Sequence, residues 1–103
     1  MNKMMESKTK KPMVLKVGSR TNMSNLVKAI IGNIKNDGVV HCDSMGPNAA
    51  FLCNKALIYA ANLLKNERKN LTVTPSLVDV EVDNPNDCVR IKTALRWTIR
   101  VQS

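Results

Sequence analysis

The stretch from Val39 to Leu64 constrains the fold more than any other part of the chain. Two valines at its start suit a β-strand, and Gly46 and Pro47 then interrupt the pattern. Proline is favoured as the first helical residue because its missing N–H has no helical partner there. From Ala49 onward, apolar residues recur at helical spacing. We therefore predict a strand that feeds a long helix, whose free N–H groups at its start suit an anion such as phosphate.

The residues before this stretch predict a shorter strand and a first helix. The strand covers 14–17 and is bounded by a glycine. Apolar residues at helical spacing follow from Met23, and either Asn22 or Ser24 is a suitable N-terminal cap. Gly38 is placed to end this helix because glycine readily adopts the left-handed conformation.

The residues after the stretch predict a β-hairpin. A third strand covers 71–82, and Pro75 marks it as an edge, a bend or a bulge because proline cannot donate to the ladder. A turn covers 83–87 by composition. From residue 89 onward apolar and polar residues alternate strictly, so one face is apolar and the other is basic. The carboxylates at 79, 81 and 83 neutralise part of this basic face if they share it.

The order of these elements is β-α-β-α-β-β. Two β-α-β crossovers and a terminal hairpin predict an α/β fold, more narrowly an α+β sandwich, with two helices on one face of a four-stranded mixed sheet. The length of 103 residues fits one domain, which we place at 13–103. We expect residues 1–12 to form a flexible basic arm.

The charge of the chain points to a polyanionic partner. Lysine and arginine number 16 against 8 acidic residues, which gives a net charge of +8. That bias favours DNA or RNA, although three aromatic residues are too few for a platform that stacks single-stranded bases. No apolar run is long enough to span a membrane, and no secretory signal is visible. Three cysteines without metal-ligand spacing predict a reducing, intracellular setting: cytoplasm, nucleoid or nucleus.

Several short motifs, in this order, resemble the stage V sporulation protein S family, a bacterial branch of the Alba-like superfamily of small nucleic-acid-binding proteins. The motifs are Val-Leu-Lys-Val at 14–17, Met-Gly at 45–46, Lys-Ala at 55–56, Pro-Ser-Leu-Val-Asp-Val-Glu-Val-Asp at 75–83 and Lys-Thr-Ala-Leu-Arg-Trp at 92–97. The resemblance covers roughly 14–101. It implies an Alba-like fold and a homodimer that pairs through the second helix and neighbouring strands.

Two departures from the family pattern stand out. The segment 48–52 reads Asn-Ala-Ala-Phe-Leu where the family has Gly-Ala-Leu-Asn-Gln. The turn after the third strand is longer than in the family, at about 84–91. The resemblance to archaeal Alba proteins implies that such an arm reaches along a nucleic-acid groove.

Two functions of different classes follow from these observations. The first is a dimeric module that binds nucleic-acid backbones with low sequence specificity. The second is a structural or regulatory interaction protein that does not use nucleic acid. One contiguous basic face supports the first, and scattered cations support the second. The candidate phosphate contacts are Lys16, Arg20, Lys28, Lys55, Arg90, Lys92, Arg96 and Arg100, and the candidate dimer contacts are Leu52, Ala56, Leu57 and Ala60.

We expect no enzymatic activity, cofactor or metal. His41 and Cys42 have no second histidine to complete a site, and Cys53 falls within an apolar stripe. The pair Asp79 and Glu81 has no neighbour that would separate their pKa values for acid–base chemistry. No phosphate-loop, dinucleotide-binding or hydrolase motif is present.

Overall fold

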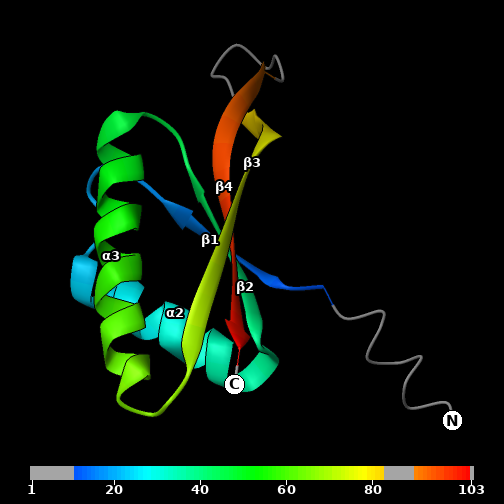
Figure 1. Ribbon diagram of the computed structural model, residues 1–103. Helices are drawn as coiled ribbons and strands as arrows, with labels where there is room; N and C mark the ends of the chain where they lie inside the picture. Colours follow the sequence, from blue (N-terminus) through cyan, green and yellow to red (C-terminus); the bar gives the residue numbers. More distant parts are fainter. Residues whose placement is uncertain (1–10, 83–89, 103) are drawn as a thin grey trace, which may run out of the picture.

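The computed structural model describes residues 11–82 and 90–102. It confirms the predicted β-α-β-α-β-β order. The elements are β1 (Met13–Val17), α2 (Met23–Asp37), β2 (Val39–Ser44), α3 (Pro47–Lys65), β3 (Asn70–Val82) and β4 (Arg90–Gln102) (Figure 1). The predicted turn at 83–87 lies outside the described residues. The predicted arm at 1–12 also lies outside them, except for residues 11 and 12.

The ends of the helices follow the predicted signals. Asn22 is the N-cap of α2, and its Oδ1 accepts a hydrogen bond from the backbone N–H of Asn25 at 2.9 Å. Gly38 ends this helix with φ of 79°, and its N–H donates to the carbonyl of Ile34. Pro47 is the first residue of α3. Local sequence therefore determines where both helices begin.

The four strands form one mixed sheet in the order β1-β2-β4-β3. Strands β1 and β2 are parallel, whereas β4 is antiparallel to both of its neighbours. Both helices lie on the same side of this sheet, as predicted (Figure 1). Strand β3 is an edge strand, the place in a sheet where a proline such as Pro75 is tolerated.

The hydrophobic core lies between the helices and the sheet. Its fully buried members include Ile30 of α2, Leu64 of α3 and Ile99 of β4. Each such side chain contributes about 1.5–3 kcal/mol relative to an exposed one. The buried face of α3 is rich in small residues, which lets this helix lie close to the sheet: Ala49, Cys53, Ala56 and Ala60. No helix within the described ranges is both long and apolar enough to cross a membrane.

Strands β3 and β4 are much longer than the others. They pair along all 13 of their residues, whereas only residues 95–100 of β4 pair with β2. The remainder of the ribbon, 78–82 with 90–94, projects beyond the rest of the sheet as an arm (Figure 1).

Candidate nucleic-acid interface

The register of the hairpin separates its cations from its carboxylates. Side chains of β4 alternate, so Arg90, Lys92, Arg96 and Arg100 share one face, which we call the basic face. On β3, Asp79 lies opposite Thr93 and Glu81 lies opposite Ile91. Directly paired residues project to the same side of a sheet, so both carboxylates lie on the other face. The expectation that these two residues neutralise the basic face is therefore corrected; Asp83 lies outside the described residues.

One carboxylate does reach the basic face, from the neighbouring strand β2. Asp43 accepts two hydrogen bonds from Arg96, at 2.7 Å from Nε and 2.8 Å from Nη2. This bidentate pair raises the pKa of the Arg96 guanidinium above its ordinary value. Asp43 is buried, so its charge requires a partner. Arg96 therefore serves first to balance Asp43.

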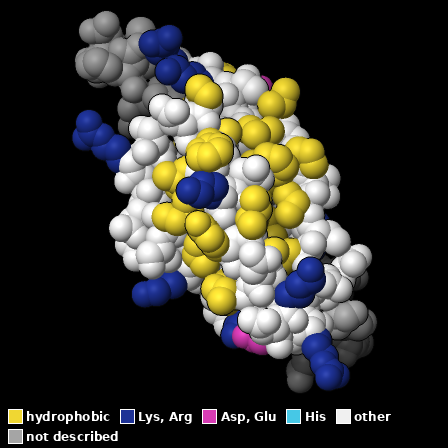
Figure 2. All heavy atoms as spheres, turned by 60° about the vertical axis from the view of Figure 1, so that its left-hand side comes forward, with side chains coloured by type: hydrophobic (Ala, Val, Ile, Leu, Met, Phe, Trp, Pro, Cys, Tyr) yellow, Lys and Arg dark blue, Asp and Glu magenta, His cyan; other side chains and the backbone are white. Residues whose placement is uncertain are grey.

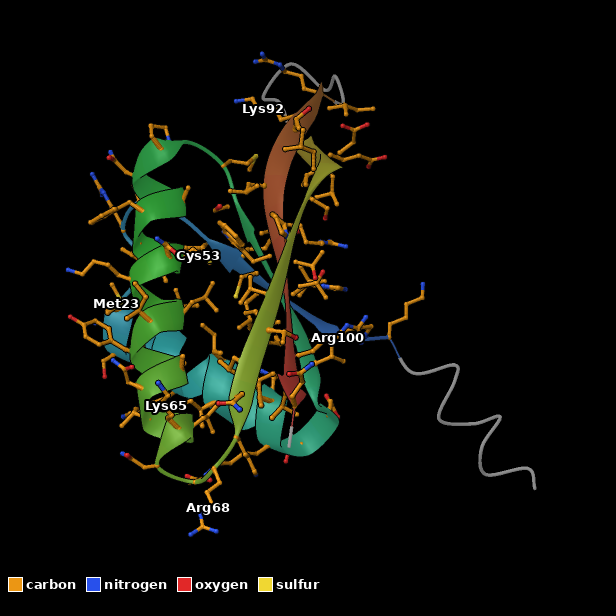
Figure 3. The ribbon with its side chains drawn as sticks, in the orientation of Figure 1. Met23, Cys53, Lys65, Arg68, Lys92 and Arg100 are labelled. Atoms are coloured by element: carbon orange, nitrogen blue, oxygen red, sulfur yellow. The ribbon has the colours of Figure 1, made fainter. Side chains whose placement is uncertain are left out.

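The helix-free face of the sheet presents cations and hydroxyl groups in rows across the strands. We call this the open face. The register places Lys16, Asp43, Arg96 and Ser76 in one row, His41, Thr98 and Thr74 in the next, and Arg100 with Thr72 in a third. Figure 3 shows Arg100 on the side of the sheet away from α3. Hydroxyl groups bind phosphate oxygens as donors. These threonines and the serine were not predicted, although their alternation along β3 was a visible signal.

His41 lies at the centre of the open face. Its Nδ1 is 3.1 Å from Oγ1 of Thr98. Burial lowers the pKa of His41 from its ordinary value, and the charges of Arg96 and Arg100 lower it further, while Asp43 acts in the opposite direction. The ring is consequently neutral at pH 7, and an anion bound beside it would favour its protonation.

The remaining predicted phosphate contacts are spread over other parts of the molecule. Arg20 is exposed in the turn after β1, where the N–H of Gly18 donates to Oγ1 of Thr21 at 2.8 Å. Lys28 belongs to α2 and Lys55 to α3, so both lie in the helix layer rather than on the open face. The structure thus brings together the cations of β1 and β4 and separates the two helical lysines from them.

The predicted dimer contacts lie mostly inside the chain. Ala56, Leu57 and Ala60 are buried in its own core, and Leu52 is partly buried against that core. The first three therefore have little surface to offer a partner. Figure 2 shows instead that exposed apolar side chains gather over the outer side of the α3 layer. We call the following set the apolar face: Phe51 and Ile58 of α3 with Val73 and Leu77 of β3, all exposed.

The two described cysteines have a structural role. Cys42 of β2 and Cys53 of α3 are free, buried thiols, and a hydrogen bond joins them. Figure 3 shows Cys53 on the side of α3 that faces the sheet. That bond and burial raise the pKa of Cys42, so its thiol is not a nucleophile at neutral pH. Within the described ranges no three potential metal ligands cluster. Cys88 lies outside those ranges.

Comparison with known proteins identifies the family. The sequence matches the family model described as Stage V sporulation protein S (SpoVS) over residues 13–102, from the start of β1 to the end of β4. The chain belongs to the stage V sporulation protein S family. This confirms the resemblance drawn from its motifs. No curated protein matches the chain in a sequence search.

The fold of this SpoVS-family chain is similar to that of a solved Alba structure. Alba from Thermoplasma volcanium aligns with a TM-score of 0.60 and 10% sequence identity, covering 84% of this chain and 98% of that chain. An identity this low shows a shared fold and nothing finer. The Alba-like architecture predicted from the sequence is thus confirmed.

Proposed function

We propose that this SpoVS-family protein binds the phosphate backbone of DNA or RNA, without catalysis, through the open face of its sheet and the basic face of β4. The observation that carries the proposal is the run of cations along β4. Arg90, Lys92 and Arg100 form no ion pair with another described residue, so no carboxylate within the described ranges neutralises their charge. Arg90 and Lys92 are neighbours on one face of the strand and repel each other, and an anionic ligand relieves that repulsion.

The chemistry of these faces suits backbone contacts better than base reading. Alternate residues of a strand are about 6.6 Å apart, so Arg90 and Lys92 present their charges along an extended line. Cations and hydroxyl groups are the side chains that contact phosphates, and they fix position without reading sequence. Trp97, the chain's single tryptophan, packs against the core on the helix side of the sheet, so it does not offer the open face a ring for base stacking.

The active form in this proposal is a homodimer that pairs through the apolar face. Phe51, Ile58 and Leu77 are each more than half exposed, which is unfavourable for a free monomer. Strand β3 also leaves one edge unpaired. Beside this surface the indole N–H of Trp97 is buried without a hydrogen-bond partner among the described residues. A second copy would cover these apolar side chains and give the assembly two basic faces.

A titration tests the proposed function. The purified protein is titrated with duplex DNA, single-stranded RNA and heparin at several salt concentrations. We expect binding to all three that weakens steeply with salt, with little dependence on nucleic-acid sequence, because the contacts are to charges. If the protein bound none of the three ligands at low salt, that result would contradict the proposal.

The apolar face also favours a second candidate, a structural or regulatory interaction protein that does not use nucleic acid. Exposed apolar patches mark protein interaction sites as readily as subunit contacts. The same titration separates the two functions. An interaction protein would bind heparin and DNA only weakly and equally, with no loss when the basic face is altered.

A further inference from the structure

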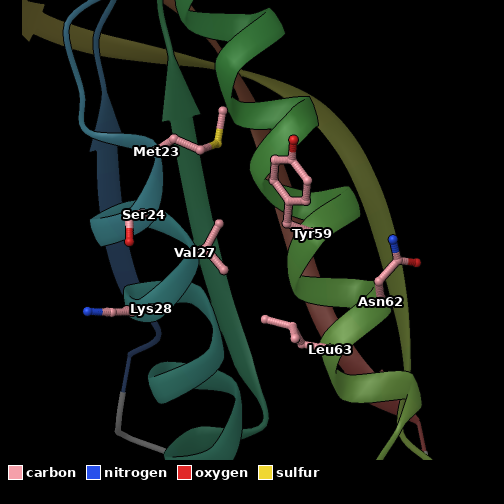
Figure 4. A pocket seen from close by; sticks show the side chains of 7 residues that line it. All are labelled: Met23, Ser24, Val27, Lys28, Tyr59, Asn62 and Leu63. Carbon is pink, nitrogen blue, oxygen red and sulfur yellow. The ribbon is translucent and has the colours of Figure 1, made fainter.

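A second surface feature lies in the helix layer, on the side of α3 that faces α2. Between the first turns of α2 and the second half of α3 there is a groove of about 540 Å³, open to solvent. Figure 4 shows that Met23 and Val27 on α2 face Tyr59 and Leu63 on α3 across this groove. Tyr59 and Leu63 are each about half exposed, at 48% and 52%. The groove is therefore an apolar surface that no described residue of the chain covers.

The walls of the groove have the geometry that receives a helix. Met23 and Val27 are four residues apart, as are Tyr59 and Leu63, so each pair forms one ridge along its own helix. Two such ridges leave a furrow into which the apolar side chains of a third helix fit. Methionine at one end adapts its shape to different partners. An open furrow of this kind suits a helix better than an enclosed small molecule.

The charge around the groove favours a partner that carries negative charge. Lys28 stands at its rim and forms no ion pair with another described residue. No carboxylate lines the groove, and α3 contains no acidic residue in its 19 positions. Two turns further along α2, Lys35 is already paired with Glu67 at 3.1 Å. A carboxylate that arrives beside Lys28 therefore gains an ion pair, whereas a cation meets only repulsion.

We propose that this groove binds an amphipathic helix of a partner protein, one whose apolar stripe is flanked by carboxylates. Nucleic acid suits this surface less well than the basic face, because Lys28 is the one cation among the residues that line the groove and its apolar side chains gain nothing from phosphates. The groove and the open face lie on opposite sides of the sheet, so the partner helix and a polyanion have separate sites (Figure 1). This inference does not depend on nucleic-acid binding.

The test uses a synthetic peptide of about 16 residues, roughly four helical turns, with leucines at helical spacing flanked by glutamates. A second peptide of the same composition has its leucines scrambled. Binding to the full chain is followed by fluorescence anisotropy and by backbone amide chemical shifts. The groove variants are Leu63→Gln and Lys28→Glu. Their matched controls are Ile91→Gln, an equally polar change at an exposed apolar residue of the arm, and Lys16→Glu, the same charge change on the open face.

We expect the patterned peptide to shift amides of α2 and α3 and to bind more tightly than the scrambled one. Leu63→Gln should weaken it about tenfold, because a buried leucine contact is lost. Lys28→Glu should weaken it about three- to tenfold, and the two controls far less. Equal binding of the two peptides, or equal effects of Lys28→Glu and Lys16→Glu, would overturn the proposal. So would a change in the oligomeric state of Leu63→Gln protein alone, since a second copy would then occupy the groove.

Discussion

At the level of single side chains, the ion pair between Asp43 and Arg96 links the stability of the sheet to its charge. Replacing Asp43 with asparagine removes two charge-assisted hydrogen bonds to Arg96 and should lower the free energy of unfolding by about 1–3 kcal/mol. The same change releases a cation on the basic face. We therefore expect tighter nucleic-acid binding, with a log–log salt slope steeper by about 0.9.

Urea unfolding and salt-dependent titration of the same preparation measure these two opposite effects. The double variant Asp43→Asn with Arg96→Gln is the control, because it loses the released cation and should return to weaker binding. A stable Asp43→Asn protein with unchanged affinity would show that the pair matters for neither property.

His41 gives the second prediction, which concerns pH. Its pKa in the folded chain lies below the ordinary 6.5 because of burial and nearby arginines, so the unfolded chain binds the proton more readily. The free energy of unfolding should therefore fall as pH decreases through about 6.5 towards the lower folded pKa. Phosphate beside the ring favours the protonated form, so nucleic-acid affinity should rise over the same range.

Urea midpoints between pH 5.5 and 7.5, roughly the range in which histidine alone titrates, measure the stability effect. His41→Gln is the comparison, since it retains hydrogen-bonding groups but cannot titrate. If both proteins show the same pH dependence of the urea midpoint, the titration of His41 does not cause it.

At the level of elements, α3 turns two different faces to its surroundings, and two adjacent residues distinguish them. Leu57 is 6% exposed and Ile58 is 53% exposed. Leu57→Arg should unfold the protein, because it places a charge in the core at a cost of at least about 3 kcal/mol. Ile58→Arg should leave the fold intact and, if the apolar face pairs two copies, produce a monomer.

Circular dichroism and sedimentation velocity of both variants test this prediction. A folded Leu57→Arg protein would contradict the core assignment. If the wild-type protein sediments as a monomer at micromolar concentration, the apolar face does not pair two copies.

The elements also show what sequence patterns can and cannot predict. The alternation along β4 correctly separated its basic and apolar faces, and Asn22, Gly38 and Pro47 correctly marked the helix ends. The face of the carboxylates on β3 could not be predicted. It depends on the pairing register across the turn, and a shift of one residue moves every side chain to the opposite face.

Contacts between residues far apart in the sequence were the other feature that could not be predicted. Asp43 and Arg96 are separated by 53 positions, and no local pattern links them. The one signal was that Asp43 is the single acidic residue of a central strand, where a buried carboxylate must find a cationic partner. The apolar stripe of α3 was recognised, but periodicity cannot tell whether its small residues pack against the chain's own sheet or against a partner. The packing of α3 against β1, β2 and β3 decides that question.

At the level of the whole molecule, the sheet divides the surface into two parts with different chemistry. The cations of β1 and β4 and the hydroxyl groups of Thr72, Thr74, Ser76 and Thr98 lie on the open face or in the arm. The apolar face and the groove belong instead to the helix layer and the adjoining edge strand. Net charge alone does not make this distinction, because lysines also occur on α2 and α3. The position of the charge must therefore be tested separately from its amount.

The most direct measurement compares two triple variants with the same change in net charge. One replaces Arg90, Lys92 and Arg100 with alanine on the basic face, and the other replaces Lys28, Lys55 and Lys65 with alanine on the helices. The affinity for duplex DNA is measured from low to moderate salt. We predict that the basic-face variant binds more weakly and that its log–log salt slope is flatter by up to about 2.7, while the helix variant resembles the wild type. Equal losses in both variants would contradict the account, because binding would then follow net charge rather than this surface.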